Sequence, residues 1–411
     1  MSNGSASPVV SPGLHFLFLN VGHFLDHLFM LIFATVAALV LSTEWGMSYA
    51  ELIPYATPGF VAFGLFALPA GWLGDRWSRH GMMCVFFVGI GAAAMLAALA
   101  QTPTQMALSL FGIGVFAAIY HPVGIALVLE GHEKTGMRVA KNGVWGNMGV
   151  AVAALLTGWL IQHQGWRAAF MLPAIGSIVL GVAYWHYIYR PSVINDSQAK
   201  KVVSKITSAA AVFDRSLLVR VLSVVFFTTA LGGLVFQSTT FALPKVIAER
   251  GGDIASSPAI IGWLAFVVFA IGSIGQLIVG YLVDRRSPKP VFIAVALLQV
   301  IFFSMMTISH GWVALVIAAG FMLAAFGQIP INDVLVGKVA RSEWRGRILA
   351  MRYAITISVM ALSVPLIAWI HGNWGFTYLF ALLAVTATLI MFTVATLPPE
   401  KQRPAEASVA T

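Results

Sequence analysis

Long stretches without charged residues dominate the pattern of hydrophobic and polar positions along the chain. They lack Asp, Glu, Lys and Arg altogether, and they cover residues 52–74, 82–129, 142–166, 168–189, 221–244, 254–283, 290–332 and 353–399. A helix needs about 20 consecutive, mostly apolar residues to cross the hydrocarbon core of a bilayer. Each stretch is therefore long enough for at least one membrane-spanning helix.

Three of these stretches are long enough for two helices each. Residues that favour turns interrupt them at Thr102-Pro103-Thr104, at His310-Gly311 and at His371-Gly372-Asn373. A further helix is expected over residues 14–41, although it carries Asp26. No charged segment or cleavage site precedes it, so we interpret it as a span and not as a signal peptide. The pattern thus predicts an all-α membrane protein with twelve transmembrane helices.

The amino-acid composition is also that of a membrane protein. Hydrophobic residues make up 59% of it and charged residues 9%, against about 25% charged residues in soluble domains. The net charge of +9 would suit a nucleic-acid partner, but its distribution does not. Twenty-one of the 24 Lys and Arg residues lie in or beside the two tails and the loops expected on the same side of the membrane as the tails. The exceptions are Arg167, Lys245 and Arg250. The positive-inside rule then places both termini in the cytoplasm and explains the charge without nucleic acid.

The chain divides into two similar halves. We expect a cytoplasmic tail over 1–13, a six-helix bundle over 14–189, a cytoplasmic linker over 190–215, a second six-helix bundle over 216–397 and a tail over 398–411. Three landmarks recur about 208 residues apart: the segment Gly71-Trp72-Leu73-Gly74-Asp75-Arg76 as Gly280-Tyr281-Leu282-Val283-Asp284-Arg285, Pro122 as Pro330, and Trp166 as Trp374. Because each copy has an even number of helices, the repeats are parallel about an axis along the membrane normal.

The segment Gly71-Trp72-Leu73-Gly74-Asp75-Arg76-Trp77-Ser78-Arg79-His80, expected as a loop between the second and third helices, resembles the signature loop of the major facilitator superfamily. Ser78 replaces a usual glycine, and Pro288 stands where the second copy usually has a base. The resemblance covers nearly the whole chain. It implies two six-helix bundles that rock about a central site.

Two segments are similar to the fosmidomycin-resistance branch of exporters within that superfamily. They are Gly22-His23-Phe24-Leu25-Asp26-His27 and Tyr120-His121-Pro122. The superfamily's antiporter signature is absent from the fifth helix, which reads Gly146-Asn147-Met148-Gly149, and the drug-exporter arginine of the fourth helix is absent as well. The branch resemblance implies export of a small organic compound, and the short outer loops fit a bacterial inner membrane.

The signature loop also implies a conformational latch. In the superfamily, an acid at the position of Asp75 faces the positive N-terminal end of a helix in the other half, which here begins near residues 345–347. The latch residues would be Gly71, Asp75, Arg76 and Arg79, with Asp284 and Arg285 in the second copy. The alternative is that Arg76 and Arg79 only anchor the loop to lipid phosphates.

Ionisable residues inside the first and fourth helices form the main candidate site. Asn20, His23, Asp26 and His27 share one face of the first helix. His23 lies about 13 Å and His121 about 12 Å from the inner ends of their helices, at 1.5 Å per residue. Such a group can hold a proton near neutral pH. Two alternatives remain open, namely helix packing through hydrogen bonds and coordination of a divalent metal.

The second half carries its own polar candidates: Gln237, Gln276, Gln328, Asn332, Asp333 and Arg352. The acid Asp333 and the base Arg352 are expected at one depth, about 7 Å from the inner ends of their helices. They form either a structural ion pair or a site for an anionic substrate. The amides could line the cavity or could join helices to one another.

No phosphate-binding loop, zinc-protease motif or nucleophile elbow occurs in the sequence. We therefore expect no enzyme activity, no cofactor and no resident metal. The sequence predicts a monomeric secondary transporter in the bacterial inner membrane that contacts lipid, protons and a small-molecule substrate, with proton-coupled efflux as its function. The alternatives are a carrier of a divalent metal or metal chelate, and a sensor on the same fold that does not transport.

Overall fold

The structure, a computed structural model, describes residues 11–131, 136–190, 215–339 and 342–398. The expected linker and both expected tails lie almost wholly outside these residues. The first half, up to residue 190, contains α1 (Pro12–Val36), η1 (Ala37–Leu41), α2 (Ser42–Glu44), α3 (Tyr49–Leu52), η2 (Ile53–Ala56), α4 (Thr57–Arg76), α5 (Arg79–Leu99), α6 (Pro103–Ala117), η3 (Tyr120–Gly124), α7 (Ile125–Leu129), α8 (Gly136–Gln164), α9 (Trp166–Tyr184) and η4 (Trp185–Tyr189). The second half, from residue 215, contains α11 (Arg215–Arg250), η5 (Gly252–Ala255), α12 (Pro258–Arg285), α13 (Pro288–Met306), α14 (Gly311–Val339) and α15 (Ser342–Ala395).

Among the described residues, eleven helices are long and apolar enough to cross a membrane. The all-helical membrane class expected from the sequence is therefore confirmed, and the difference from twelve spans arises in α15. This helix contains a kink at Gly375, whose φ of 75° and ψ of −174° are not helical, so two helices join there. The break was expected at His371–Asn373 and lies a few residues later, because only glycine adopts this backbone conformation without strain.

Short polar residues begin the helices at the expected breaks. The Thr102 side chain accepts a hydrogen bond from the Gln105 amide at 3.2 Å, and Pro103 occupies the first turn of α6. Ser78 caps α5 in the same way, with the Gly81 amide donating at 3.0 Å. These caps satisfy amides that a helix start leaves without partners.

The signature segment is less of a loop than its sequence indicated. Asp75 and Arg76 lie in the last turn of α4, and only Trp77 and Ser78 separate them from α5. The expectation that Asp75 and Arg76 sit in a loop is therefore wrong. A base in the last turn of a helix is favourable, because it faces the negative end of the helix dipole.

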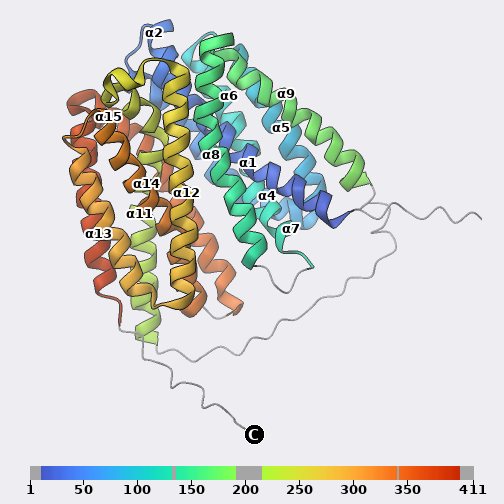
Figure 1. Cartoon of the computed structure of the whole chain (residues 1–411). Helices are drawn as coiled ribbons and strands as arrows, with labels where there is room; N and C mark the ends of the chain where they lie inside the picture. The colour runs from blue at the N-terminus through green and yellow to red at the C-terminus, as the bar shows by residue number, and fades with distance from the viewer. Residues whose placement is uncertain (1–10, 132–135, 191–214, 340–341, 399–411) are drawn as a thin grey trace, which may run out of the picture.

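The two halves lie side by side and diverge toward the end of the molecule where α11 begins (Figure 1). We call this the terminal end. At the other end, α8 and α12 approach each other backbone to backbone. A Cβ on Gly158 would lie 2.3 Å from the Pro258 carbonyl oxygen, and one on Gly262 would lie 2.5 Å from the Ala154 carbonyl oxygen. Small residues allow such close helix contacts in membranes, so the halves are tightly joined at the end opposite the termini.

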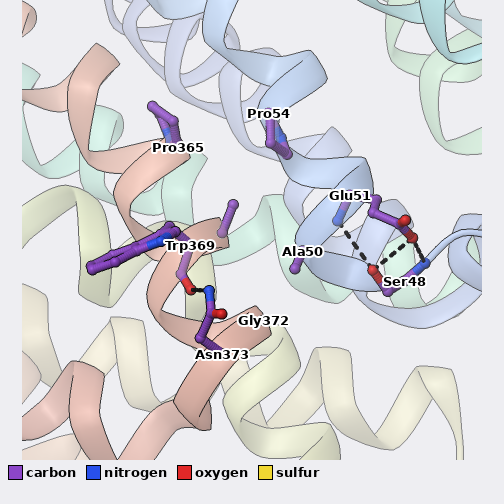
Figure 2. A pocket seen from close by; sticks show the side chains of 9 residues that line it. Ser48, Ala50, Glu51, Pro54, Pro365, Trp369, Gly372 and Asn373 are labelled. Atoms are coloured by element: carbon purple, nitrogen blue, oxygen red, sulfur yellow. Dashed lines mark hydrogen bonds between the residues drawn. The ribbon is translucent and has the colours of Figure 1, made fainter.

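An open hollow of about 640 Å³ lies near that same end, between α3 with η2 and α15. Figure 2 shows Ala50 on α3 and Gly372 on α15 among the residues that line it. Ser48 and Glu51 form a reciprocal cap at the start of α3, in which the Glu51 carboxylate accepts from the Ser48 amide at 2.8 Å (Figure 2). The hollow shares no residue with the histidine site described next.

Candidate functional site

A local distortion of the fourth predicted span turns the His121 side chain toward the first span. Pro122 has no amide hydrogen and its ring would collide with the carbonyl four residues earlier, so it disrupts an α-helix. The chain accordingly passes from α6 into the π-helical turn η3, Tyr120–Gly124, before α7. Turns of this kind are frequent at functional sites. Here the turn places His121 beside Asp26 of α1.

His23 is held on three sides. Its Nδ1 donates a hydrogen bond to the Asn142 carbonyl oxygen of α8 at 2.8 Å. Its ring stacks on Tyr120, with centroids 4.8 Å apart. Gly146 covers part of the ring, since a Cβ there would lie 2.6 Å from His23 Nε2. One ring orientation is thereby fixed before any ligand arrives.

His27 extends the cluster by one helical turn. Its Nε2 lies 3.2 Å from His23 Nε2. Because His23 Nδ1 carries a proton for the Asn142 carbonyl, a neutral His23 presents a lone pair at Nε2 and accepts from His27. The two imidazoles therefore form a short chain along which a proton can be held or passed.

Asp26 is the buried acid of the cluster. Its side chain is 1% exposed, and its Oδ2 lies 3.4 Å from His121 Nε2. Neither carboxylate oxygen has a hydrogen-bond partner, and neither has Nδ1 of His121. A buried carboxylate without hydrogen-bond partners is costly, and His121 is the neighbouring group that can offset this cost.

The same imidazoles also meet a geometric condition for metal binding. Each of His23, His27 and His121 offers a nitrogen, and these nitrogens lie within 4.8 Å of one another. Two ligands of one tetrahedral zinc ion with bonds of about 2.0–2.1 Å lie about 3.3 Å apart. The His23–His27 pair, at 3.2 Å, has this spacing, whereas the widest pair would have to close before the three imidazoles could hold one ion.

The second half contributes an ion pair at the boundary between the two halves, which we call the seam. Arg352 Nη2 of α15 lies 2.5 Å from Asp333 Oδ1 of α14, which joins the two residues expected at one depth. The next residue, Tyr353, has its ring centroid 5.8 Å from that of His121. His121 of the first half and Tyr353 of the second half thus face each other between the halves, next to the Arg352–Asp333 pair.

The predicted amides lie in three different surroundings. Asn20 belongs to the site, because Asn142 Nδ2 donates to its Oδ1 at 3.0 Å. Gln328 and Asn332 instead pack inside the second half, where Gln299 donates to Gln328 at 2.9 Å and Thr228 donates to Asn332 at 3.2 Å. Gln237 is buried in α11, and its Nε2 has no hydrogen-bond partner.

Two asparagines of α8 were not singled out as site residues from the sequence. Asn142 connects Asn20, Tyr120 and His23, and Asn147 donates to Gln276 of α12 at 2.6 Å, across the seam. Both are uncharged polar residues within an apolar span, which is the signal that could have identified them. Polar side chains inside a membrane segment generally need a partner.

The signature residues lie at the terminal end. Asp75 accepts from Arg79 at 2.7 Å, and its side chain is 68% exposed. Gly71 lets α4 approach η3, since a Cβ there would lie 3.1 Å from Pro122 Cβ. Arg76 and Arg285 each lie over an aromatic ring four residues earlier, Trp72 and Tyr281, and Asp284 is exposed.

Comparisons with known proteins agree with this architecture. The chain is 23% identical over 388 residues to the gallate transporter of Pseudomonas putida, with 84% of this chain and 85% of that protein covered. It is 24% identical over 335 residues to the multidrug resistance protein MdtG of Yersinia enterocolitica, with 80% and 78% covered.

Among solved structures, a D-xylose–proton symporter matches with a TM-score of 0.74 at 16% identity, over 95% of this chain and 99% of that one. The fold of this chain is thus that of known transporters. The family model described as Major Facilitator Superfamily matches residues 19–257 and 225–411. The chain belongs to the Major Facilitator Superfamily, a family of secondary transporters, as the signature segment indicated.

Proposed function

We propose that this protein moves a small organic solute across the bacterial inner membrane and couples that movement to protons. The observation that carries the proposal is the Asp26–His121 pair: a carboxylate that is 1% exposed, without a hydrogen-bond partner, 3.4 Å from an imidazole. Ionisable residues at this depth are costly in a membrane protein and mark ion pathways. We count the two arms of α15 separately, which gives twelve crossings in two bundles over 14–189 and 216–397.

Coupling requires that the protonated and deprotonated sites favour different conformations. A proton shared by Asp26 and His121 removes the unpaired buried charge, whereas a deprotonated pair leaves that charge in need of water or a counter-ion. Because His121 contacts Tyr353 of the other half, the charge state of the pair acts directly at the seam between the halves. His23 and His27 would extend the path for the proton.

The arrangement of the halves supports alternating access. They are joined at the end opposite the termini through Gly158 and Gly262 and diverge toward the terminal end (Figure 1). With both termini in the cytoplasm, as the charge distribution indicates, this is an inward-facing state. The opposite state would bring the terminal ends together, where Asp75 would serve as the latch.

Efflux is the direction that we propose. It rests on the resemblance of the segments around His23 and His121 to the fosmidomycin-resistance branch, and on the relative named as a multidrug resistance protein. The gallate transporter among the relatives favours an organic acid as the solute. We expect the monomer to be the working unit, because each chain supplies both halves of the site.

Purified protein in proteoliposomes tests this function. We expect an imposed pH gradient to drive flux of at least one solute from a panel of organic acids, amines and sugars, and a protonophore to abolish it. Binding without flux under every gradient would support a sensor. Flux of Zn²⁺ or Mn²⁺ that needs no organic solute would support the metal-carrier alternative. The three neighbouring imidazoles are the structural reason for testing it.

A further inference from the structure

Arg352 and Asp333 make only one of the two contacts that an arginine–carboxylate pair can form. A guanidinium and a carboxylate of matched geometry join through two parallel hydrogen bonds. Here Arg352 contacts Asp333 through Nη2 and Oδ1, and its buried Nε has no hydrogen-bond partner. An unsatisfied buried donor costs about 1–3 kcal/mol. When Asp333 moves aside, the Nε–Nη2 edge of Arg352 can therefore receive another carboxylate, which would also give Nε its missing partner.

The burial of the pair is uneven in the direction that a binding site requires. The Arg352 side chain is 12% exposed, whereas that of Asp333 is 48% exposed. A buried pair that served only to join α14 to α15 would enclose both partners. The exposed acid can instead move away from the guanidinium or share it when an anion arrives.

One aromatic ring lies near this guanidinium, and it belongs to a row of rings that crosses from one half to the other. Tyr353 follows Arg352 in α15; its ring centroid lies 5.8 Å from the Arg352 Cζ, and the residue is 41% exposed. The His121 ring lies 5.8 Å from Tyr353 at 45°, and the Phe63 ring of α4 lies 5.8 Å from His121 at 74°. Rings from both halves therefore meet at Tyr353, next to the guanidinium, and offset or edge-on arrangements of this kind favour contact with further aromatic rings.

We infer that an aromatic carboxylate binds between the halves at Arg352, Tyr353 and His121, with the carboxylate on the Nε–Nη2 edge of Arg352 in place of Asp333 and the ring against Tyr353. The inference rests on the proposed function and specifies its substrate class. A neutral amide of the same shape lacks the charge that the guanidinium needs. An aliphatic acid lacks the ring surface that Tyr353 and His121 would contact.

Equilibrium binding to the purified full-length protein, with no gradient imposed, tests the inference by calorimetry. The probes are benzoate, its neutral analogue benzamide and its non-aromatic analogue cyclohexanecarboxylate. We expect benzoate to bind about tenfold or more tightly than either analogue, since a hydrogen bond to a charged group contributes about 1.5–3 kcal/mol and tenfold corresponds to about 1.4 kcal/mol.

Three variants assign the preference to residues. Arg352→Gln combined with Asp333→Asn removes both charges, so that no unpaired charge stays buried, and we expect the preference for benzoate over benzamide to disappear. Tyr353→Leu should remove the preference for the aromatic ring and keep the preference for the charge. Arg286→Gln, at an exposed base just after α12, is the control and should bind as the wild type does.

The outcomes separate this inference from the proposed function. Equal binding of benzoate and benzamide, or unchanged benzoate preference in the double variant, overturns the carboxylate site. Proton-coupled flux of another solute by a protein that does not bind benzoate overturns the substrate class alone. Benzoate binding that depends on Arg352, in a protein that moves no solute under any gradient, leaves the site intact and overturns transport.

Discussion

Asp26 of α1 and His121 of the π-helical turn η3 meet inside the first half, with Oδ2 and Nε2 3.4 Å apart. Neither oxygen of Asp26 has a hydrogen-bond partner. A structural ion pair usually has its remaining lone pairs satisfied, because the interior does not compensate for lost water. This relationship is the basis of our proposal that the pair changes its charge during a transport cycle.

Asp26→Asn should uncouple transport from the pH gradient. The amide keeps the shape of the carboxyl group and cannot bind a transported proton. We expect pH-driven flux in proteoliposomes to fall by about tenfold or more, while solute exchange without a gradient continues. His121→Ala should reduce the driven flux similarly. Asp253→Asn, at an exposed acid of η5, is the control, and undiminished driven flux in both site variants would mean that the cluster serves packing only.

Gly146→Ala should damage the site through a steric contact. Its Cβ would lie 2.6 Å from His23 Nε2, so the ring must leave its position between Tyr120 and α8. We expect flux to fall about tenfold, because overpacking of this kind costs about 1–3 kcal/mol. Gly143→Ala, one turn earlier in α8, is the matched control, since its Cβ would make an ordinary 3.6 Å contact with Gln276. Equal flux in the two variants would contradict the fixed orientation of His23.

A cysteine pair should lock the end opposite the termini. A Cβ on Gly372 would lie 2.8 Å from the Ala50 Cβ, and a small shift gives the roughly 3.5–4.5 Å that a disulfide needs. We expect Ala50→Cys with Gly372→Cys, in a Cys84→Ala background, to cross-link on oxidation and to stop flux until a reductant is added. Each single variant should remain active under oxidant. Full transport by the cross-linked protein would exclude opening at this end.

Asp75→Asn should alter the balance between conformations and leave folding intact. The Asp75–Arg79 pair is exposed, and exposed pairs contribute about 0–1 kcal/mol to stability. An acid at a helix N-terminus is worth about 0.3–2 kcal/mol, and about 1.4 kcal/mol shifts an equilibrium tenfold. We expect lower flux and greater labelling of cysteines placed at the seam from the cytoplasmic side. Unchanged flux and labelling would leave only a lipid-anchoring role for the segment.

Fusions to alkaline phosphatase should report the orientation, since this enzyme is active only outside the cytoplasm. We expect a fusion at the C-terminus to be inactive and one within residues 43–49 to be active, as the distribution of Lys and Arg predicts. The contrasting fusion site is the internal control for expression. An active C-terminal fusion would overturn both the orientation and the twelve-crossing count.

The sequence by itself determined the membrane class and most helix boundaries. Charge is so costly in lipid that the uncharged stretches mark the helices directly, and the caps at Thr102 and Ser78 follow from residue type. Spacing along one helix also placed Asn20, His23 and Asp26 together, because periodicity is a local property. The signature segment was enough to identify the superfamily, although not to show that Asp75 and Arg76 lie in α4.

Only the tertiary structure decided which helices share the site and how its groups are paired. Helical period says nothing about the neighbour that a face meets, so the roles of Asn142, of Gly146 over the His23 ring and of Tyr353 against His121 could not be derived from spacing. The same holds for the second half, where Gln328 and Asn332 bind inside their own bundle while Arg352 faces the seam. Partners in a polar network are set by contacts between distant segments, and those depend on how all the helices pack together.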